Sequence, residues 1–176
     1  MARKIKILTD NEGLDRREVG YYSTPRFVAD YLTQEMLAIN PQGDGVLDPA
    51  TGKEELLASF YEAYRHIDSF DIIDHGIHKY SSFQCKDFIE FYIERMSCLP
   101  MQCQKYDYMI ANPPYNCHEV SYIKDNKKRL SAAFPIGAYN MYSMFLSAMI
   151  SIAKEGCLIG VIISDSFLTA TLHAKL

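Results

Sequence analysis

The chain has 176 residues, of which 48% are hydrophobic and 23% are charged, and its formal net charge is −4. These values are typical of a globular protein with one domain and exclude a disordered or fibrous chain. The negative charge argues against a protein that grips nucleic acid over its whole surface, because phosphate neutralisation requires clustered Lys and Arg.

The N-terminal part of the chain predicts a leader and then a helix. Residues 1–20 are rich in charge and are interpreted as a leader segment, and residues 21–176 are expected to form the domain. Ser23 or Thr24 is expected to cap the helix, with Pro25 near its first turn. Its apolar stripe consists of Phe27, Val28, Tyr31, Leu32, Met36 and Leu37.

Short apolar runs alternate with helical patterns along the rest of the chain. The expected strands are 45–48, 69–74, 82–85, 105–111 and 156–163. Helices are expected around Leu56 to Tyr64, from Asp87 to Met96, and over about 139–154. This alternation predicts an α/β domain whose largely parallel sheet is flanked by helices, with ligands outside the carboxyl ends of the strands. Polar residues stand at four such ends, namely Asp48, Asp74, the region of Asp87, and Asn112.

The most specific pattern is Asn112-Pro-Pro-Tyr115, which directly follows an apolar strand. Pro113 and Pro114 force a rigid turn whose carbonyl groups remain free to accept hydrogen bonds. The side-chain oxygen of Asn112 and the carbonyl of Pro113 are expected to accept from one amino group, while the ring of Tyr115 stacks on a planar base. Two such acceptors would localise the lone pair of an aromatic amine without a strong base. A plain Pro-Pro turn is the alternative.

With these residues in place, the chain resembles the gamma class of N6-adenine DNA methyltransferases of type I and type II restriction-modification systems. The resemblance covers about Gly20 to Leu168. Its elements, in the family's order, are Gly20-Tyr-Tyr-Ser-Thr-Pro25, Asp48-Pro-Ala-Thr-Gly52, Asp74, Asp87-Phe88, Asn112 to Tyr115, and Ser166-Phe-Leu168. The resemblance implies a Rossmann-like S-adenosylmethionine-dependent methyltransferase fold.

The resemblance also assigns residues to the two ends of the cofactor. Those implied for its methionine end are Thr24, Pro25, Asp48, Pro49, Ala50 and Gly52. Asp74 would accept from the ribose hydroxyls, Asp87 would accept from the adenine amino group, and Phe88 would lie against that ring. The structural alternatives are that Asp48 or Asp87 caps the following helix, and that Asp74 is a solvated loop acid.

One position departs from the family's pattern, since Glu54 stands where a second glycine usually follows Gly52. Its side chain either obstructs the cofactor and repels the cofactor's carboxylate, or points outward on the first helical turn, where the helix dipole favours an acid. The first outcome would leave a catalytically silent module with the same fold.

The function implied by the resemblance is transfer of a methyl group from S-adenosylmethionine to an adenine flipped out of double-stranded DNA, without a metal. The partners would be DNA and other domains or subunits of a restriction-modification system. Two rivals remain open: a methyltransferase acting on protein glutamine or RNA, and a silent binding or assembly module. A basic stretch, Lys124 with Lys127 to Arg129, is either a solvated face or a mobile loop that closes on DNA phosphates.

Other patterns indicate the cellular location and argue against disulfide and metal sites. No apolar run approaches the roughly 18 residues that span a bilayer, and no signal peptide precedes the domain, so a cytoplasmic location is expected. The five cysteines include no CxxC pair, which favours reduced thiols. His75 and His78 lack a second ligand pair and are interpreted as loop residues.

The end of the sequence predicts an N-terminal fragment of a longer enzyme, with the target-recognition domain absent, and such a fragment is expected to methylate no specific DNA site by itself. The family's fold continues past Ser166 to Leu168, and residues 169–176 contain no helix stop or polar tail. A missing basic domain would account for the net charge, and an unpaired sheet edge would favour dimerisation or aggregation.

Overall fold

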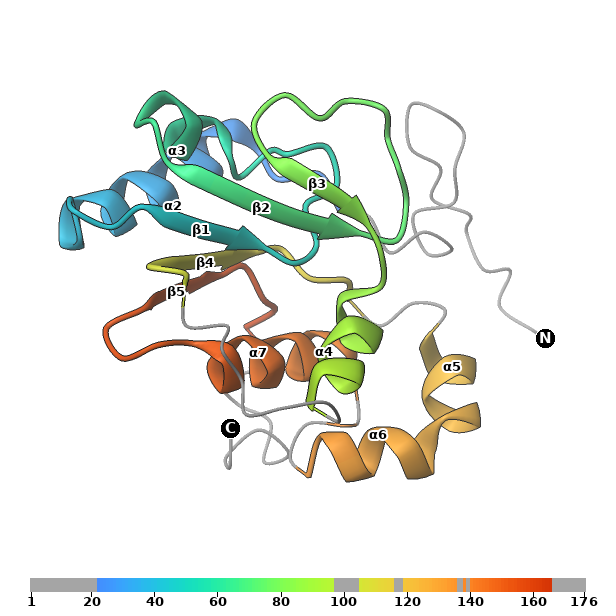
Figure 1. The fold of residues 1–176 in the computed structure, drawn as a ribbon. Coiled ribbons are helices and arrows are strands. Elements are labelled where there is room, and N and C mark those ends of the chain that lie inside the picture. Colours follow the sequence, from blue (N-terminus) through green and yellow to red (C-terminus); the bar gives the residue numbers. More distant parts are fainter. Residues whose placement is uncertain (1–21, 97–104, 116–118, 136–137, 139, 166–176) are drawn as a thin grey trace.

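The computed structural model describes residues 22–96, 105–115, 119–135, 138 and 140–165, and in this part of the chain a five-stranded sheet forms the centre (Figure 1). Its strands are β1 (Gly45–Asp48), β2 (His66–Asp71), β3 (Ser82–Cys85), β4 (Tyr108–Ala111) and β5 (Leu158–Val161). All neighbouring pairs are parallel, and their order is β3-β2-β1-β4-β5. The predicted α/β class with a parallel sheet is therefore confirmed.

The direction in which the chain adds strands to the sheet changes between β1 and β4. The chain builds β1, β2 and β3 outward, then returns to place β4 on the other side of β1 and β5 beyond it. Val46 of β1 is paired with Tyr108 of β4, and Leu47 with Met109. The carboxyl ends of β1 and β4 thus meet at the topological switch point, where open α/β sheets bind ligands. This pairing brings the turn after Asp48 next to the turn that begins at Asn112.

Helices cover both faces of the sheet (Figure 1). On one face lie α2 (Arg26–Ile39) and α3 (Ala58–Glu62), and on the other lie α4 (Phe88–Met96) and α7 (Met141–Ile152). The remaining helices of the described part are α5 (Glu119–Asp125) and α6 (Lys127–Ala133). Because strand side chains alternate, Val46 and Ile110 belong to the core under α2 and α3, whereas Leu47 and Met109 belong to the core under α4 and α7.

The start of α2 differs from the expectation. The helix begins at Arg26 after Pro25, and no side chain caps it. The expected caps, Ser23 and Thr24, instead bond to the carboxylate of Glu55.

The buried face of α2 is also rotated from the expected stripe. Ala29, Thr33 and Met36 are buried, while Phe27 and Tyr31 of the expected stripe are 75% and 68% exposed. The prediction of that stripe was therefore wrong for these two aromatic residues, because the face of α2 that packs against α3 and the sheet contains Ala29, Thr33 and Met36 instead.

The structure also corrects other expectations from the sequence. The strand expected at 69–74 lies at 66–71, because Asp71 accepts from the backbone N–H of Ile73 at 3.0 Å and the resulting turn ends the strand. The helix expected around Leu56 to Tyr64 is reduced to α3, and Tyr64, with a φ of 58°, has a backbone conformation that a right-handed helix does not contain. Lys124 lies in α5 and Lys127 to Arg129 lie in α6, with a turn at Asn126 between them, so of the two alternatives for this basic stretch the loop was wrong.

Several expectations fall outside the described residues. They concern the leader at 1–20, the Ser166 to Leu168 element and the last residues, 169–176. Within the described residues, no helix is long and apolar enough to cross a membrane. The same residues contain no group of three or more His, Cys, Asp or Glu arranged to hold a metal ion.

Candidate active site

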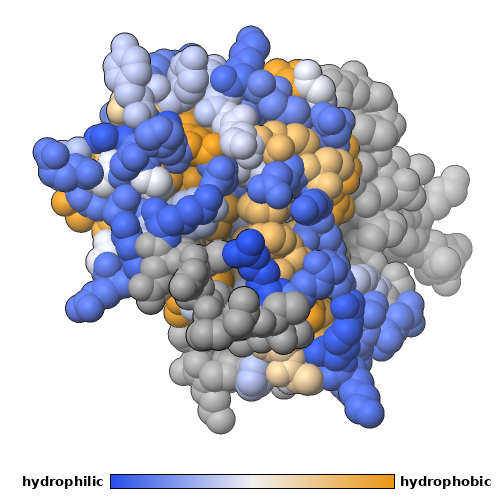
Figure 2. All heavy atoms as spheres, in the orientation of Figure 1, coloured by the Kyte–Doolittle hydropathy of each residue, from blue (hydrophilic) through white to orange (hydrophobic). Residues whose placement is uncertain are grey.

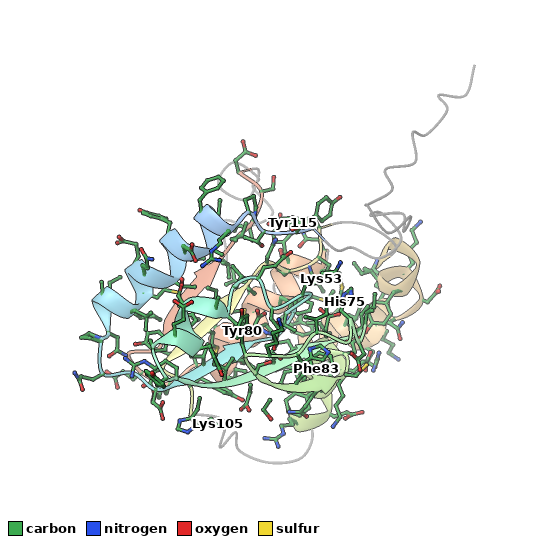
Figure 3. All side chains as sticks on the ribbon, turned by 90° about the horizontal axis from the view of Figure 1, so that it is seen from above. Lys53, His75, Tyr80, Phe83, Lys105 and Tyr115 are labelled. Atoms are coloured by element: carbon green, nitrogen blue, oxygen red, sulfur yellow. The ribbon has the colours of Figure 1, made fainter. Side chains whose placement is uncertain are left out.

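A cavity of about 270 Å³ lies at the carboxyl ends of the strands. Its walls come from the turns after β1, β2, β3 and β4, from residues 22 and 24 ahead of α2, and from α5 and α7. Figure 2 shows apolar residues at the surface beside these strand ends, framed by hydrophilic side chains. In Figure 3, Lys53, His75 and Tyr115 lie toward this end of the sheet, whereas Lys105 lies at the opposite end. The cavity is therefore where the fold predicts a ligand.

The turn after β1 is held in place by hydrogen bonds to Asp48, at the end of β1, and to Phe70 and Asp71 of the neighbouring strand β2. Asp48 Oδ1 accepts from the N–H of Ala50 at 3.1 Å, and the N–H of Thr51 donates to the carbonyl of Phe70 at 2.9 Å. Gly52 has a φ of 53°, which favours glycine, and its N–H donates to Asp71 Oδ2 at 2.8 Å. Residues 49–52 line the cavity, while Asp48 is fully buried. Burial raises the pKa of Asp48 to about 8.

Asp71, rather than Asp74, is the acid at the end of β2. Asp71 lines the cavity and binds the glycine turn. Asp74 lies three residues further on, with its side chain 58% exposed, and it binds His78 Nε2 at 2.8 Å. That bond holds the pKa of Asp74 below its usual range. The expected strand end was therefore misplaced by three residues, although the sequence HIDSFD contains the alternation that marks the real one.

Glu54 neither points outward nor enters the cavity. Its side chain is 1% exposed, and its carboxylate accepts from the N–H groups of Lys79, Tyr80 and Ser81 at 2.6, 3.0 and 3.1 Å. The hydroxyl of Ser81 also donates to it, at 2.5 Å. Both readings of this departure from the family's pattern are thereby corrected, because Glu54 is an internal anchor for the segment that leads into β3.

Asp87 and Phe88 follow β3 and open α4. Asp87 Oδ1 accepts from the N–H groups of Ile89 and Glu90 at 2.8 and 3.2 Å, so Asp87 caps the helix while also lining the cavity. Desolvation by burial raises the pKa of this carboxyl. Phe88 is 2% exposed, lines the cavity, and packs against Phe145 with ring centroids 5.6 Å apart. This end of the cavity combines an acid with an apolar wall.

Asn112 lies immediately after β4. Its Nδ2 donates to the carbonyl of Tyr22 and to Thr24 Oγ1, both at 2.9 Å. Its Oδ1 is buried and has no hydrogen-bond partner among the described residues. Since a buried acceptor without a partner is costly, Oδ1 is a candidate position for a ligand's donor.

The rest of the turn after β4 lies around this amide. Pro114 lines the cavity, and Pro113 is buried. The hydroxyl of Tyr115 donates to the carbonyl of Ile162, and its ring meets the ring of Tyr22 edge-on at 5.6 Å. Burial raises the pKa of Tyr115 to about 12. The tie to Ile162 was not anticipated, because it joins residues 47 apart in the sequence.

The fold thus gathers most of the predicted site residues at one cavity. Those lining it are Thr24, Pro49, Ala50, Gly52, Asp87, Phe88, Asn112 and Pro114. Asp48, Pro113 and Tyr115 adjoin these residues in the chain, Pro25 is exposed at the start of α2, and Asp74 is displaced from the strand end. Sequence reasoning missed Tyr22, Glu55 and Asp71, and only Asp71 had a local signal, its place at the end of an alternating run.

A known protein family and a solved structure match parts of the chain. Residues 48–176 match the model of the family described as Eco57I restriction-modification methylase. No curated protein matches the chain. Among solved structures, the chain is similar to a modification subunit of a putative type I restriction enzyme from Vibrio vulnificus YJ016, with 19% identity and a TM-score of 0.41. That match covers 57% of this chain and 25% of the length of the modification subunit.

Proposed function

Because the chain belongs to the Eco57I restriction-modification methylase family, we propose that it is a DNA methyltransferase that transfers a methyl group from S-adenosylmethionine to the N6 amino group of adenine. The observation that carries this proposal is the buried, unpartnered Oδ1 of Asn112 beside the cavity. An exocyclic amino group is one donor that such an acceptor binds. Double-stranded DNA and further subunits of a restriction-modification system are the proposed partners.

The residues around the cavity fit S-adenosylmethionine. The turn containing Gly52 allows a close approach of backbone to ligand. Asp71 is the proposed acceptor for the ribose hydroxyls in place of Asp74, and Asp87 is the proposed acceptor for the adenine amino group. Phe88 supplies an apolar surface for the ring. When bound, the cofactor supplies an electrophilic methyl group.

The residues after β4 would prepare the target amine. Asn112 Oδ1 and the carbonyl of Pro113 accept from its two hydrogens and aim its nitrogen at the methyl carbon, while the ring of Tyr115 stacks on the flipped base. In the transfer, the target nitrogen would bond to the methyl carbon as the bond from that carbon to sulfur breaks, and the nitrogen would then release a proton to solvent. Alignment and pre-oriented dipoles supply most of the acceleration.

The test is a transfer assay with methyl-labelled S-adenosylmethionine and the purified chain. Mixed-sequence duplex DNA should gain label as N6-methyladenine, whereas a duplex of guanine and cytosine alone, RNA and a protein lysate should not. Asn112→Ala should lower transfer by about 100-fold or more, because it removes an interaction needed in the transition state. Asn40→Ala, at the C-terminal end of α2, is the matched control and should keep wild-type activity. Label appearing in protein or RNA instead of DNA would refute the proposal.

A further inference from the structure

The amide of Asn112 is held by a short segment, Tyr22 to Thr24, that precedes α2 and is about 90 residues away in the sequence. One bond runs from Asn112 Nδ2 to the carbonyl of Tyr22 at 2.9 Å, with a sequence separation of 90. The second runs from the same nitrogen to Thr24 Oγ1, also at 2.9 Å. Thr24 is 6% exposed, so its hydroxyl lies largely away from solvent.

These two bonds determine which way the amide faces. A carbonyl oxygen has no hydrogen and can only accept, so the NH2 group of Asn112 must face Tyr22. Thr24 Oγ1 takes the other hydrogen. With both hydrogens occupied, Oδ1 is the atom of this amide that remains without a partner among the described residues. The segment therefore turns the acceptor, and not the donor, of Asn112 toward any incoming group.

The segment is itself fastened to the turn that follows β1. Glu55 Oε1 accepts from the hydroxyl of Ser23 at 2.7 Å, and Glu55 Oε2 accepts from the N–H of Thr24 at 2.8 Å. Glu55 also lines the cavity, three residues after Gly52. One hydrogen-bonded path thus runs from the turn after β1, through Thr24, to the turn after β4.

We infer that Thr24 is a positioning residue for Asn112, with Glu55 as its anchor, and that its hydroxyl acts on the reaction through the amide rather than by holding the methionine end of the cofactor. This inference rests on the proposed function, in which Asn112 Oδ1 accepts from the target amine. It is an alternative to the expectation from sequence that Thr24 binds the cofactor directly, and the cofactor affinity of a Thr24 variant distinguishes the two.

The test uses Thr24→Val, which keeps the shape of the side chain and removes the acceptor. At saturating DNA and cofactor, kcat should fall about tenfold, because one hydrogen bond that orients the amide is lost. The calorimetric Kd for S-adenosylmethionine should stay within about twofold of wild type. Thr24→Ser should restore kcat. Thr33→Val is the matched control, since its hydroxyl bonds only to backbone carbonyls within α2, and it should keep wild-type kinetics.

A second readout does not depend on activity. The side-chain amide signals of Asn112, identified in an NMR spectrum by their loss in Asn112→Ala, should exchange slowly with solvent in the wild-type chain. Exchange should become about tenfold faster in Thr24→Val and in Glu55→Gln, because the bonds that protect the amide are lost or weakened.

The two readouts separate failure of this inference from failure of the proposed function. A wild-type chain that methylates no DNA refutes the function, and the amide signals then still decide the role of Thr24. Unchanged amide exchange in both variants, or a Thr24→Val variant with weaker cofactor binding and wild-type kcat, overturns the inference.

Discussion

Glu54 occupies a backbone conformation that ordinarily favours glycine. Its φ is 59°, yet the side chain is buried and makes four hydrogen bonds to residues 79–81. The cost of a left-handed residue is on the order of 1–2 kcal/mol. The bonds to three backbone N–H groups offset that cost, because these groups would otherwise be left without acceptors. The buried carboxylate therefore stabilises a turn whose backbone conformation favours glycine.

Glu54→Gly should lower the free energy of unfolding by about 1–3 kcal/mol, because the lost hydrogen bonds outweigh the relieved backbone strain. Cofactor affinity should also fall, since the segment 79–81 loses its anchor. Urea unfolding and calorimetry measure the two effects. Tyr64→Gly is the matched control, because Tyr64 has a φ of 58° and is 92% exposed. Its change in stability should stay within about 1 kcal/mol of zero. Equal effects of the two variants would show that the Glu54 carboxylate contributes nothing.

Asp48 makes stability depend on pH. Burial raises its pKa from the usual 3.8 to about 8, so folding takes up a proton between these values. The associated stability is full below about pH 4 and is lost as pH rises toward 8, with a slope of up to about 1.4 kcal/mol per pH unit. Asp48→Asn should remove this slope in urea unfolding between pH 4 and 9.

The control for this pH dependence is Asp44→Asn. Asp44 is exposed, and its hydrogen bond from His66 holds the pKa of the carboxyl below its usual range. Its small contribution should therefore be lost as pH falls, which is the opposite sign. Parallel stability curves for the wild-type chain and Asp48→Asn would contradict the assignment of the slope to Asp48.

At the scale of elements, the basic side chains of α5 and α6 have two different roles. Arg129 of α6 binds the carboxylate of Glu90 on α4 through both of its terminal nitrogens, one at 2.5 Å, and lowers the pKa of that carboxyl. Glu90 also accepts from the hydroxyl of Tyr122 on α5 at 2.5 Å. Lys124, Lys127 and Lys128 are exposed. The arginine therefore joins helices, and the lysines face solvent.

Replacing the three lysines by Gln should weaken DNA binding and reduce its dependence on salt. The slope of log Kd against log salt should fall by about 0.9 for each lysine that contacts a phosphate. Arg129→Gln should leave that slope unchanged and lower the free energy of unfolding by about 1 kcal/mol. Fluorescence anisotropy with labelled duplex at several salt concentrations measures the first effect, and urea unfolding the second. An Arg129 variant that changes the salt slope as the lysine variants do would contradict this division.

At the scale of the whole molecule, residues from both helical layers and from the ends of the strands line the same cavity. Its walls include Leu56 from the side of α3 and Phe145 from α7. A ligand bound there stabilises the folded state by about 2.7 kcal/mol at 100 times its Kd. S-adenosylmethionine should therefore raise the Tm of the chain.

The matched pair Asp71→Asn and Asp74→Asn tests which acid contributes to this stabilisation. Asp71→Asn should abolish most of the rise in Tm, measured against the same variant without ligand, because Asp71 lines the cavity. Asp74→Asn should keep it, since Asp74 is exposed and bound to His78. The reverse result would restore Asp74 as the ribose acceptor.

Much of the fold was predictable from local patterns. The alternation of apolar runs and helical stripes predicted the α/β class, β1, β3 and α4, and the match to a restriction-modification methylase family is confirmed. The pattern at Asn112 to Tyr115 located the turn after β4, because Pro residues restrict the backbone wherever they stand. Such features depend on residues close together in the chain, so the sequence by itself determined them.

Other features were decided only by tertiary structure. The acid at the end of β2 depends on where pairing with β1 stops, and the role of Glu54 depends on a segment 25 to 27 residues away. The orientation of Asn112 depends on Tyr22 and Thr24, 90 and 88 residues away. A side chain's hydrogen-bond partner is set by which backbone groups the fold leaves within about 3 Å. Sequence spacing does not encode that distance. The spacing could therefore predict which residues lie together at the strand ends, but not which group each side chain binds.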